Sequence, residues 1–190
     1  MADFLTVRQF INGDITAFEA LMKTEGDRFM SFIRRYFRDQ ESIDDVYQNA
    51  WMRIWIKREQ LRIEGKFRSW AFQILRSCIY TYIRKKNWGV ELFFFDPDAL
   101  PLTVSTQPSP YRQLACREWQ LILNQEIQRM DQQTQEIFSL HFEGELNLRE
   151  ISEVLNLPLN SVKTKFRRSI QKLRKNLEAL NISIEELNTL

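Results

Sequence analysis

The side chains that could catalyse a reaction or bind a metal ion are not arranged in the sequence as such a site requires. Asp44 and Asp45 are adjacent carboxylates, but neighbours on a helix point about 100° apart, which argues against a nuclease metal site. No carboxylate or histidine follows them at the third or fourth position to complete such a site. Cys78 and Cys116 form no CxxC pair, and His141, the only histidine, has no nucleophile in a recognisable motif beside it. The sequence therefore predicts a protein that is not an enzyme and that binds no metal or cofactor.

Two basic segments indicate binding to a polyanion instead. Six Lys or Arg and no acid lie between Lys66 and Lys86, and seven and no acid lie between Lys163 and Lys175. Exposed helices usually intersperse Glu among their cations, so these runs favour nucleic-acid binding over plain solvent exposure. The formal net charge of the chain is only +2, so the clustering of the cations, and not their total, carries this argument.

Length and composition limit the class of protein. The 190 residues are enough for two small domains, and 44% hydrophobic with 27% charged residues excludes a largely disordered chain. No apolar run is long enough to span a bilayer, and the first residues lack the pattern of a signal peptide. We therefore expect a cytoplasmic protein with no membrane insertion of its own.

A proline-rich segment divides the chain. Four of the five prolines lie within residues 97–110, which predicts a flexible linker at 89–114. Apolar residues on both sides recur every three or four positions, so the fold class is all-α, with two small helical domains at 1–88 and 115–180 and a tail at 181–190. Gly13, Gly26 and Gly65 are expected to separate the first helices. The helices are predicted near residues 14–23, 25–38, 42–57, 66–86, 112–128, 131–143, 147–155 and 161–179.

The C-terminal half contains a helix, a short break and a longer basic helix, which is the helix-turn-helix pattern. Asn160 and Ser161 are expected to cap the second helix. Its apolar stripe consists of Val162, Phe166, Ile170, Leu173, Leu177 and Leu180. The other face is polar and basic, as a helix in the major groove of DNA requires. We assign base-edge contacts to Ser161, Thr164, Lys165 and Arg168, and phosphate contacts to Lys163, Arg167 and Lys172.

The helix at 42–57 also has a polar face. Its spacing buries Ile43, Val46, Tyr47, Ala50 and Ile54 and leaves Asp44, Asp45, Gln48, Asn49 and Met52 on the other side. An acid and amide patch with one Met suits a basic protein partner better than DNA. Solvent exposure alone is the simpler explanation of this patch when it is considered in isolation.

The helix at 66–86 combines aromatic rings with cations. Its spacing buries Phe67, Trp70, Ala71, Ile74, Leu75 and Cys78, and exposes Ser69, Phe72, Gln73, Arg76, Tyr80, Ile83 and Arg84. Rings that stack on bases, beside cations that follow phosphates, favour single-stranded nucleic acid. The alternative is that Phe72 and Tyr80 pack against another helix of the same domain.

Three segments in this order resemble an extracytoplasmic-function (ECF) sigma factor of bacterial RNA polymerase. Residues 44–55 resemble the family's core-polymerase-binding helix, residues 67–77 the helix that faces the −10 element, and residues 142–168 the −35-binding helix-turn-helix. The resemblance covers roughly residues 8–88 and 115–178. Asn49, Asn160 and the pair Met130-Asp131 depart from the usual family residues.

The resemblance implies a dissociable specificity subunit that carries no chemistry. Its partners would be bacterial core RNA polymerase, promoter DNA and an anti-sigma factor, and its linker, with Asp96 and Asp98, would run toward the polymerase active-site channel. Core-polymerase binding falls to Asp44, Asp45, Gln48, Asn49 and Met52. Binding of the −10 element falls to Gln60, Leu61, Arg62, Lys66, Arg68, Ser69, Phe72, Gln73, Arg76, Tyr80 and Arg84. Binding of the −35 element falls to the seven residues assigned above to base edges and phosphates.

The main alternative is an autonomous helix-turn-helix regulator that binds duplex DNA without polymerase. That function accounts for the C-terminal half but gives no role to the acid and amide patch or to the aromatic and basic helix. Such regulators usually dimerise to bind two half-sites, so a tight dimer with specific duplex affinity would favour it. The sequence assigns no role to Phe93–Phe95, which could be a buried anchor or a partner contact, or to the tail after Asn181.

Overall fold

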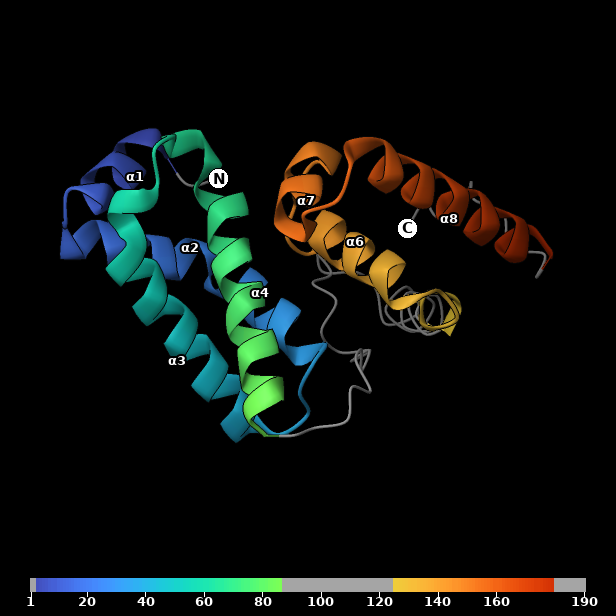
Figure 1. Cartoon of the computed structure of the whole chain (residues 1–190), viewed down its shortest axis with the longest axis horizontal. Helices are drawn as coiled ribbons and strands as arrows, with labels where there is room; N and C mark the ends of the chain where they lie inside the picture. Colours follow the sequence, from blue (N-terminus) through green and yellow to red (C-terminus); the bar gives the residue numbers. More distant parts are fainter. Residues whose placement is uncertain (1–2, 87–124, 180–190) are drawn as a thin grey trace, which may run out of the picture.

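The computed structural model describes residues 3–86 and 125–179, and all of the regular secondary structure in these two ranges is helical (Figure 1). This confirms the prediction of an all-α protein with two helical domains. The N-terminal domain contains α1 (Phe4–Ile11), α2 (Ile15–Arg34), α3 (Gln40–Lys57), the short 3-10 segments η1 (Arg58–Gln60) and η2 (Glu64–Lys66), and α4 (Phe67–Lys85). The C-terminal domain contains α6 (Gln132–Phe142), α7 (Leu148–Leu155) and α8 (Leu159–Ala179). None of these helices is both long and apolar enough to cross a membrane.

Local polar residues fix where several helices begin. The Asp14 carboxylate accepts hydrogen bonds from the backbone N–H groups of Thr16 and Ala17, at 2.8 and 3.2 Å, at the start of α2. Asn147 and Glu150 form a reciprocal capping box at the start of α7. A cap satisfies backbone donors that the first helical turn leaves unpaired. The sequence signal for the α7 cap, Asn followed three residues later by Glu, was present but was not among our predictions.

The structure corrects the predicted helix boundaries in the N-terminal domain. An additional helix, α1, precedes the first predicted one, because Val7 and Phe10 are buried against the rest of the domain. Gly26 does not end a helix, since α2 runs through it without a break. A Cβ at position 26 would lie 2.7 Å from the Tyr47 hydroxyl oxygen of α3. The missing side chain therefore serves the close packing of α2 on α3.

The predicted cap of the second helix in the helix-turn-helix is also wrong. Because α8 begins at Leu159, Asn160 and Ser161 lie inside its first turn, and the Pro158 carbonyl accepts from the N–H groups of Ser161 and Val162. Four predictions lie outside the described residues: most of the helix near 112–128, the linker with Asp96 and Asp98, Phe93–Phe95, and the tail. The exact domain boundaries therefore stay predictions.

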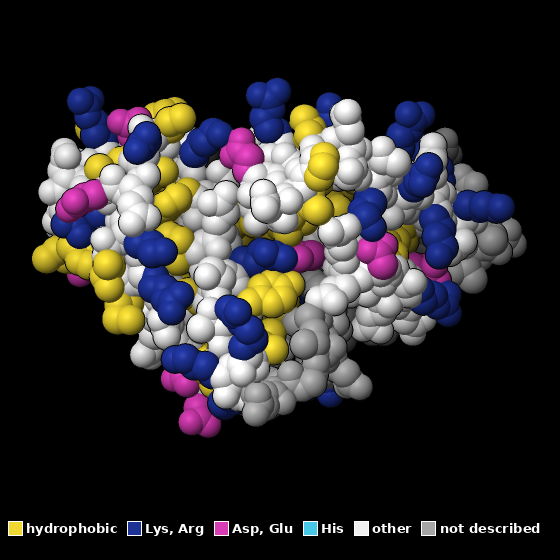
Figure 2. All heavy atoms as spheres, in the orientation of Figure 1, with side chains coloured by type: hydrophobic (Ala, Val, Ile, Leu, Met, Phe, Trp, Pro, Cys, Tyr) yellow, Lys and Arg dark blue, Asp and Glu magenta, His cyan; other side chains and the backbone are white. Residues whose placement is uncertain are grey.

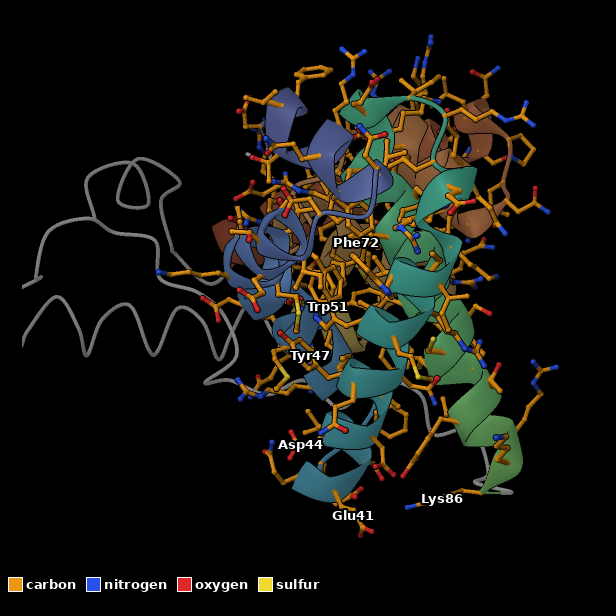
Figure 3. All side chains as sticks on the ribbon, turned by 90° about the vertical axis from the view of Figure 1, so that its left-hand side faces the viewer. Glu41, Asp44, Tyr47, Trp51, Phe72 and Lys86 are labelled. Atoms are coloured by element: carbon orange, nitrogen blue, oxygen red, sulfur yellow. The ribbon has the colours of Figure 1, made fainter. Side chains whose placement is uncertain are left out.

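Aromatic rings dominate the core of the N-terminal domain. Phe29 of α2 stacks on Trp51 of α3 at 4.8 Å between ring centroids and meets the edge of Phe72 of α4 at 5.1 Å. Figure 3 shows Trp51 and Phe72 in the interior and the half-buried Tyr47 beside Trp51, while Glu41 and Asp44 lie at the beginning of α3. The core is continuous across both domains, since buried residues of α6, α7 and α8 join the same cluster. Figure 1 shows α7 beside α4, so the C-terminal domain rests on that helix.

Candidate polymerase and DNA interfaces

The outer face of α3 presents the predicted polymerase-binding residues to solvent. Asp45, Gln48, Asn49 and Met52 are exposed, as the helical spacing predicted, and we call these four residues the docking face. Asp44 is half-buried and accepts a hydrogen bond from Gln40 Nε2 at 2.8 Å, which holds it at the edge of this face.

One apolar residue beside the docking face was not among the predicted residues. Ile56 lies one helical turn beyond Met52 and is 64% exposed, against 55% for Met52. Two large apolar side chains exposed on one face of a helix, beside acid and amide groups, are typical of a surface that binds another protein. The four-residue spacing from Met52 was the signal that could have identified Ile56.

A pocket of about 210 Å³ lies between the segment after η1 and the beginning of α4. It gathers six of the side chains predicted to bind the −10 element, namely Gln60, Leu61, Arg62, Lys66, Ser69 and Gln73. Trp70, which was predicted to be in the core, is half-buried and lines the pocket with Ile63. Glu153 of α7 completes the lining from the other domain. The pocket thus combines an aromatic ring, an amide, cations and a hydroxyl, which together suit one unstacked nucleobase and its phosphate.

Phe72 is not on the outer face of α4, where the sequence analysis placed it. Its side chain is 0% exposed and packs between Phe29 and Phe32, so the alternative, in which it packs within its own domain, describes this structure. Ser69 and Ile83 are buried as well, at 2% and 6% exposure. The outer-face prediction was wrong at these three positions, because α2 and α3 pack along one side of α4 and the C-terminal domain covers another.

Two predicted DNA-binding cations of α4 have carboxylate partners. Arg68 donates two hydrogen bonds of 2.9 Å to the wholly buried Glu25 of α2. Arg76 donates to Glu136 of α6 at 2.7 Å and lies over the ring of Tyr80. Burial alone would lower the pKa of Arg76, but its hydrogen bond to Glu136 and the negative charge there outweigh burial, so the pKa is raised. Both guanidinium groups therefore stay charged and engaged in this arrangement, whereas Arg84 is exposed.

The predicted −35-binding side chains line the outside of α8. Val162 and Leu173 are buried, as the apolar stripe predicted. Ser161, Lys163, Thr164, Arg167, Arg168 and Lys172 are all exposed. Lys165 is half-buried and forms an ion pair of 3.1 Å with Asp131, the capping residue of α6. Figure 2 shows the resulting row of Lys and Arg side chains along α8.

The turn that joins α7 to α8 sets the angle between them. Asn156 adopts the left-handed conformation, with φ at 54°, and the Leu157 N–H donates to the Ser152 carbonyl at 2.9 Å. Asn tolerates this backbone better than most residues, because its short side chain can hydrogen-bond locally. The turn ends α7 abruptly and lets α8 begin at once, as a helix-turn-helix requires.

No group of three or more His, Cys, Asp or Glu within residues 3–86 and 125–179 could hold a metal ion. Cys78 is a buried thiol, and burial raises its pKa. His141 contacts the Leu146 carbonyl through Nδ1 at 2.9 Å and packs on Phe166.

Comparison with known proteins identifies the family of this chain. The family model of sigma-70 region 2 matches residues 21–89, and that of sigma-70, region 4 matches residues 120–173. Together the two matches span more than half of the chain and fall one on each domain.

Comparison with whole proteins supports the same family. The ECF RNA polymerase sigma factor SigW of Bacillus subtilis is 26% identical over 179 residues, which are 92% of this chain and 96% of the relative. The RNA polymerase sigma factor SigZ of the same organism is 28% identical over 149 residues, which are 78% of this chain and 80% of the relative. Among solved structures, CnrH in complex with the cytosolic domain of CnrY matches with a TM-score of 0.62 and 19% identity, covering 94% of this chain and 99% of that one. The chain belongs to the ECF sigma factors, which bind core RNA polymerase and direct promoter recognition.

Proposed function

We propose that this sigma factor uses three separate surfaces, each to bind a different partner or promoter element. The docking face of α3 binds core polymerase, the pocket at the start of α4 holds an unstacked base of the −10 element, and the outer face of α8 binds the −35 element in the major groove. The observation that carries this proposal is the pocket, because six side chains assigned to the −10 element on sequence grounds meet there.

The pocket supports a way of melting DNA that uses no ATP. Unstacking a base costs a few kcal/mol. Stacking the freed base on an aromatic ring such as Trp70 returns roughly 1–3 kcal/mol. Lys66 and Arg62 at the rim are placed to neutralise the adjoining phosphates. Binding energy alone would then hold the strand open, and the protein needs no catalytic residue.

We propose one further partner and a site of action. The solved relative CnrH is bound to the cytosolic domain of CnrY, and by analogy an anti-sigma protein binds this chain. Because it acts on RNA polymerase, we expect it to work in the bacterial cytoplasm.

The docking face is tested by run-off transcription from a panel of candidate promoters with core polymerase. We expect the double substitution Asp45→Ala and Gln48→Ala to lower protein-dependent initiation at least about tenfold, because central interface residues cost about 1–2 kcal/mol or more each when truncated. The matched control is Gln9→Ala with Glu19→Ala, an exposed amide and an exposed acid on α1 and α2, which should leave transcription unchanged. Specific duplex binding by a tight dimer without any stimulation of polymerase would instead establish an autonomous regulator.

The two classes of side chain on α8 should respond differently to substitution. We expect Arg168→Ala to cost about 1–3 kcal/mol in −35 binding and to relax base preference at one position. Lys172→Ala should weaken binding to all sequences alike and reduce the slope of log K against log salt by about 1. Fluorescence anisotropy with promoter and scrambled duplexes over a range of KCl measures both effects. An equal effect of Arg168→Ala on both duplexes would contradict its assignment to a base edge.

A further inference from the structure

The C-terminal domain turns a row of carboxylates toward the N-terminal domain. We call this row the acidic face, and its members are Glu136 of α6, Glu143 and Glu145 of the α6–α7 turn, and Glu153 of α7. Each carboxylate contacts a different place on α2, α4 or the segments that join them. Figure 2 shows basic and acidic side chains meeting where the two domains adjoin.

Two of these carboxylates are buried in the contact. Glu136 is 3% exposed and accepts hydrogen bonds from Arg76 Nε at 2.7 Å and from the Tyr36 hydroxyl at 3.0 Å. Burial raises the pKa of Tyr36 well above its usual value, and the charge of Glu136 adds to this effect, so Tyr36 remains a proton donor. Glu143 accepts from Arg35 Nε with both oxygens, at 2.7 and 2.8 Å. Buried charges with such partners mark a built interface and not an accidental encounter of two surfaces.

The turn between α6 and α7 is shaped to reach the cations. Glu145 has a positive φ of 50°, a left-handed backbone that is uncommon for Glu. From there its carboxylate pairs with Arg28 at 2.7 Å and with Arg68 at 3.1 Å. The hydrogen bond from Arg28 is the main cause of a pKa of Glu145 below its ordinary value. Beside it, a Cβ on Gly144 would lie 3.2 Å from the ring of Phe72, so the turn backbone sits directly on α4.

The last carboxylate lies at the pocket itself. Glu153 accepts from Lys66 Nζ at 2.8 and 2.9 Å, and the Glu153 carbonyl accepts from Gln73 Nε2 at 3.1 Å. Lys66 and Gln73 both line the pocket, and Glu153 is part of its wall. An acid therefore occupies the position at the rim where the phosphate of a bound strand would be neutralised.

The acidic face leaves α8 uncovered. The four carboxylates pair with cations of the N-terminal domain, and Lys163, Arg167 and Arg168 of α8 remain open to solvent. The contact therefore covers one of the two proposed DNA-binding surfaces and spares the other.

We propose that the acidic face is a docking surface for the chain's own −10-binding surface, so that the free protein is closed to the −10 strand but open to duplex DNA. This inference rests on the proposed function of the pocket. The carboxylates take the positions of DNA phosphates, and a strand can bind only in the fraction of molecules whose domains have separated. The apparent affinity for single-stranded DNA is lowered by that fraction. Binding to polymerase, which must hold the two domains at separate promoter elements, removes the block.

The test uses the full chain with Glu136→Gln, Glu145→Gln and Glu153→Gln combined, which keeps side-chain size and removes three charges. A control triple, Asp14→Asn, Glu19→Gln and Glu41→Gln, makes the same charge change at exposed acids of α3 and of the beginning of α2, and an amide at position 14 can still cap α2. Small-angle X-ray scattering measures the radius of gyration. Anisotropy measures binding to fluorescein-labelled random-sequence 20-mers, single-stranded and duplex. We expect the interface triple to be larger than the parent chain and to bind single strands at least about tenfold more tightly. Duplex binding should change less than about twofold relative to the control.

Equal size and equal single-strand affinity in the two triples would overturn the inference, as would expansion without tighter binding. Because run-off transcription with core polymerase is a separate measurement, it distinguishes this failure from failure of the proposed function: closure can be absent in a sigma factor that still initiates. A charge swap tests the same contact independently, in case the interface triple does not fold. Lys66→Glu should expand the chain, and Lys66→Glu with Glu153→Lys should restore the parent radius of gyration. Expansion in the swapped protein equal to that in Lys66→Glu alone would also count against the acidic face.

Discussion

Replacing Phe72 by alanine is expected to lower the free energy of unfolding by about 3–5 kcal/mol. The ring is 0% exposed and meets Phe29 and Phe32 edge-on, with centroids 5.1 and 5.4 Å away. Its removal takes apolar surface out of the core and leaves a cavity between α2 and α4, because rigid helices relax only partly. Urea unfolding followed by circular dichroism measures the change.

The neighbouring residue supplies the control for Phe72. Gln73 is exposed on the same turn of α4, so Gln73→Ala should change stability by less than about 0.5 kcal/mol. It should instead weaken single-strand binding in the presence of core polymerase. A stable Phe72→Ala protein with impaired DNA binding would restore the outer-face prediction and contradict the packing described above.

The second large effect is expected at Arg68. Substitution by alanine should cost about 3–5 kcal/mol of stability, because it leaves the wholly buried Glu25 without its two 2.9 Å hydrogen bonds. Arg28 lies 3.7 Å from the same carboxylate, too far to replace them. Thermal and urea unfolding of the full chain measure the loss.

Arg62→Ala is the matched control for Arg68→Ala, since Arg62 is an exposed arginine at the pocket. It should leave the unfolding midpoint nearly unchanged and reduce open-complex formation. If Arg68→Ala behaved like Arg62→Ala, with full stability and weaker melting, the guanidinium would act on DNA and not on the fold. The double substitution Glu25→Leu with Arg68→Met should recover part of the lost stability, because replacing both charges by apolar groups is often neutral or favourable.

Sequence reasoning predicted the exposed faces of isolated helices well. The spacing on α3 and α8 placed Val46, Ile54 and Val162 inside and Gln48 and Arg168 outside, as the structure has them. These helices pack along one side only, so a single apolar stripe describes them. The positions of α3, α4, α6 and α7 followed from the same periodicity.

The prediction failed where a helix is covered on more than one side. α4 packs against α2, α3 and α7, and its buried surface is therefore wider than one stripe. Phe72 and Ile83 were assigned to solvent because they lie off the main apolar stripe of that helix, yet both are buried. The partners of Arg68 and Arg76, Glu25 and Glu136, are distant in sequence, and one chain without its fold carries no signal for such pairs. The continuous α2 was missed because a glycine at a close helix crossing has the same sequence appearance as one at a helix end.

The four carboxylates of the acidic face project from one small domain, and the cations that they meet project from another. Because packed helices carry each set, separation of the domains should break all of the pairs in a single step. Contacts of this kind behave as multivalent ones: each pair holds the others at high local concentration. The fraction of open molecules should therefore respond to a competing polyanion or to core polymerase with a threshold, remaining low until the competitor can replace most of the contacts together.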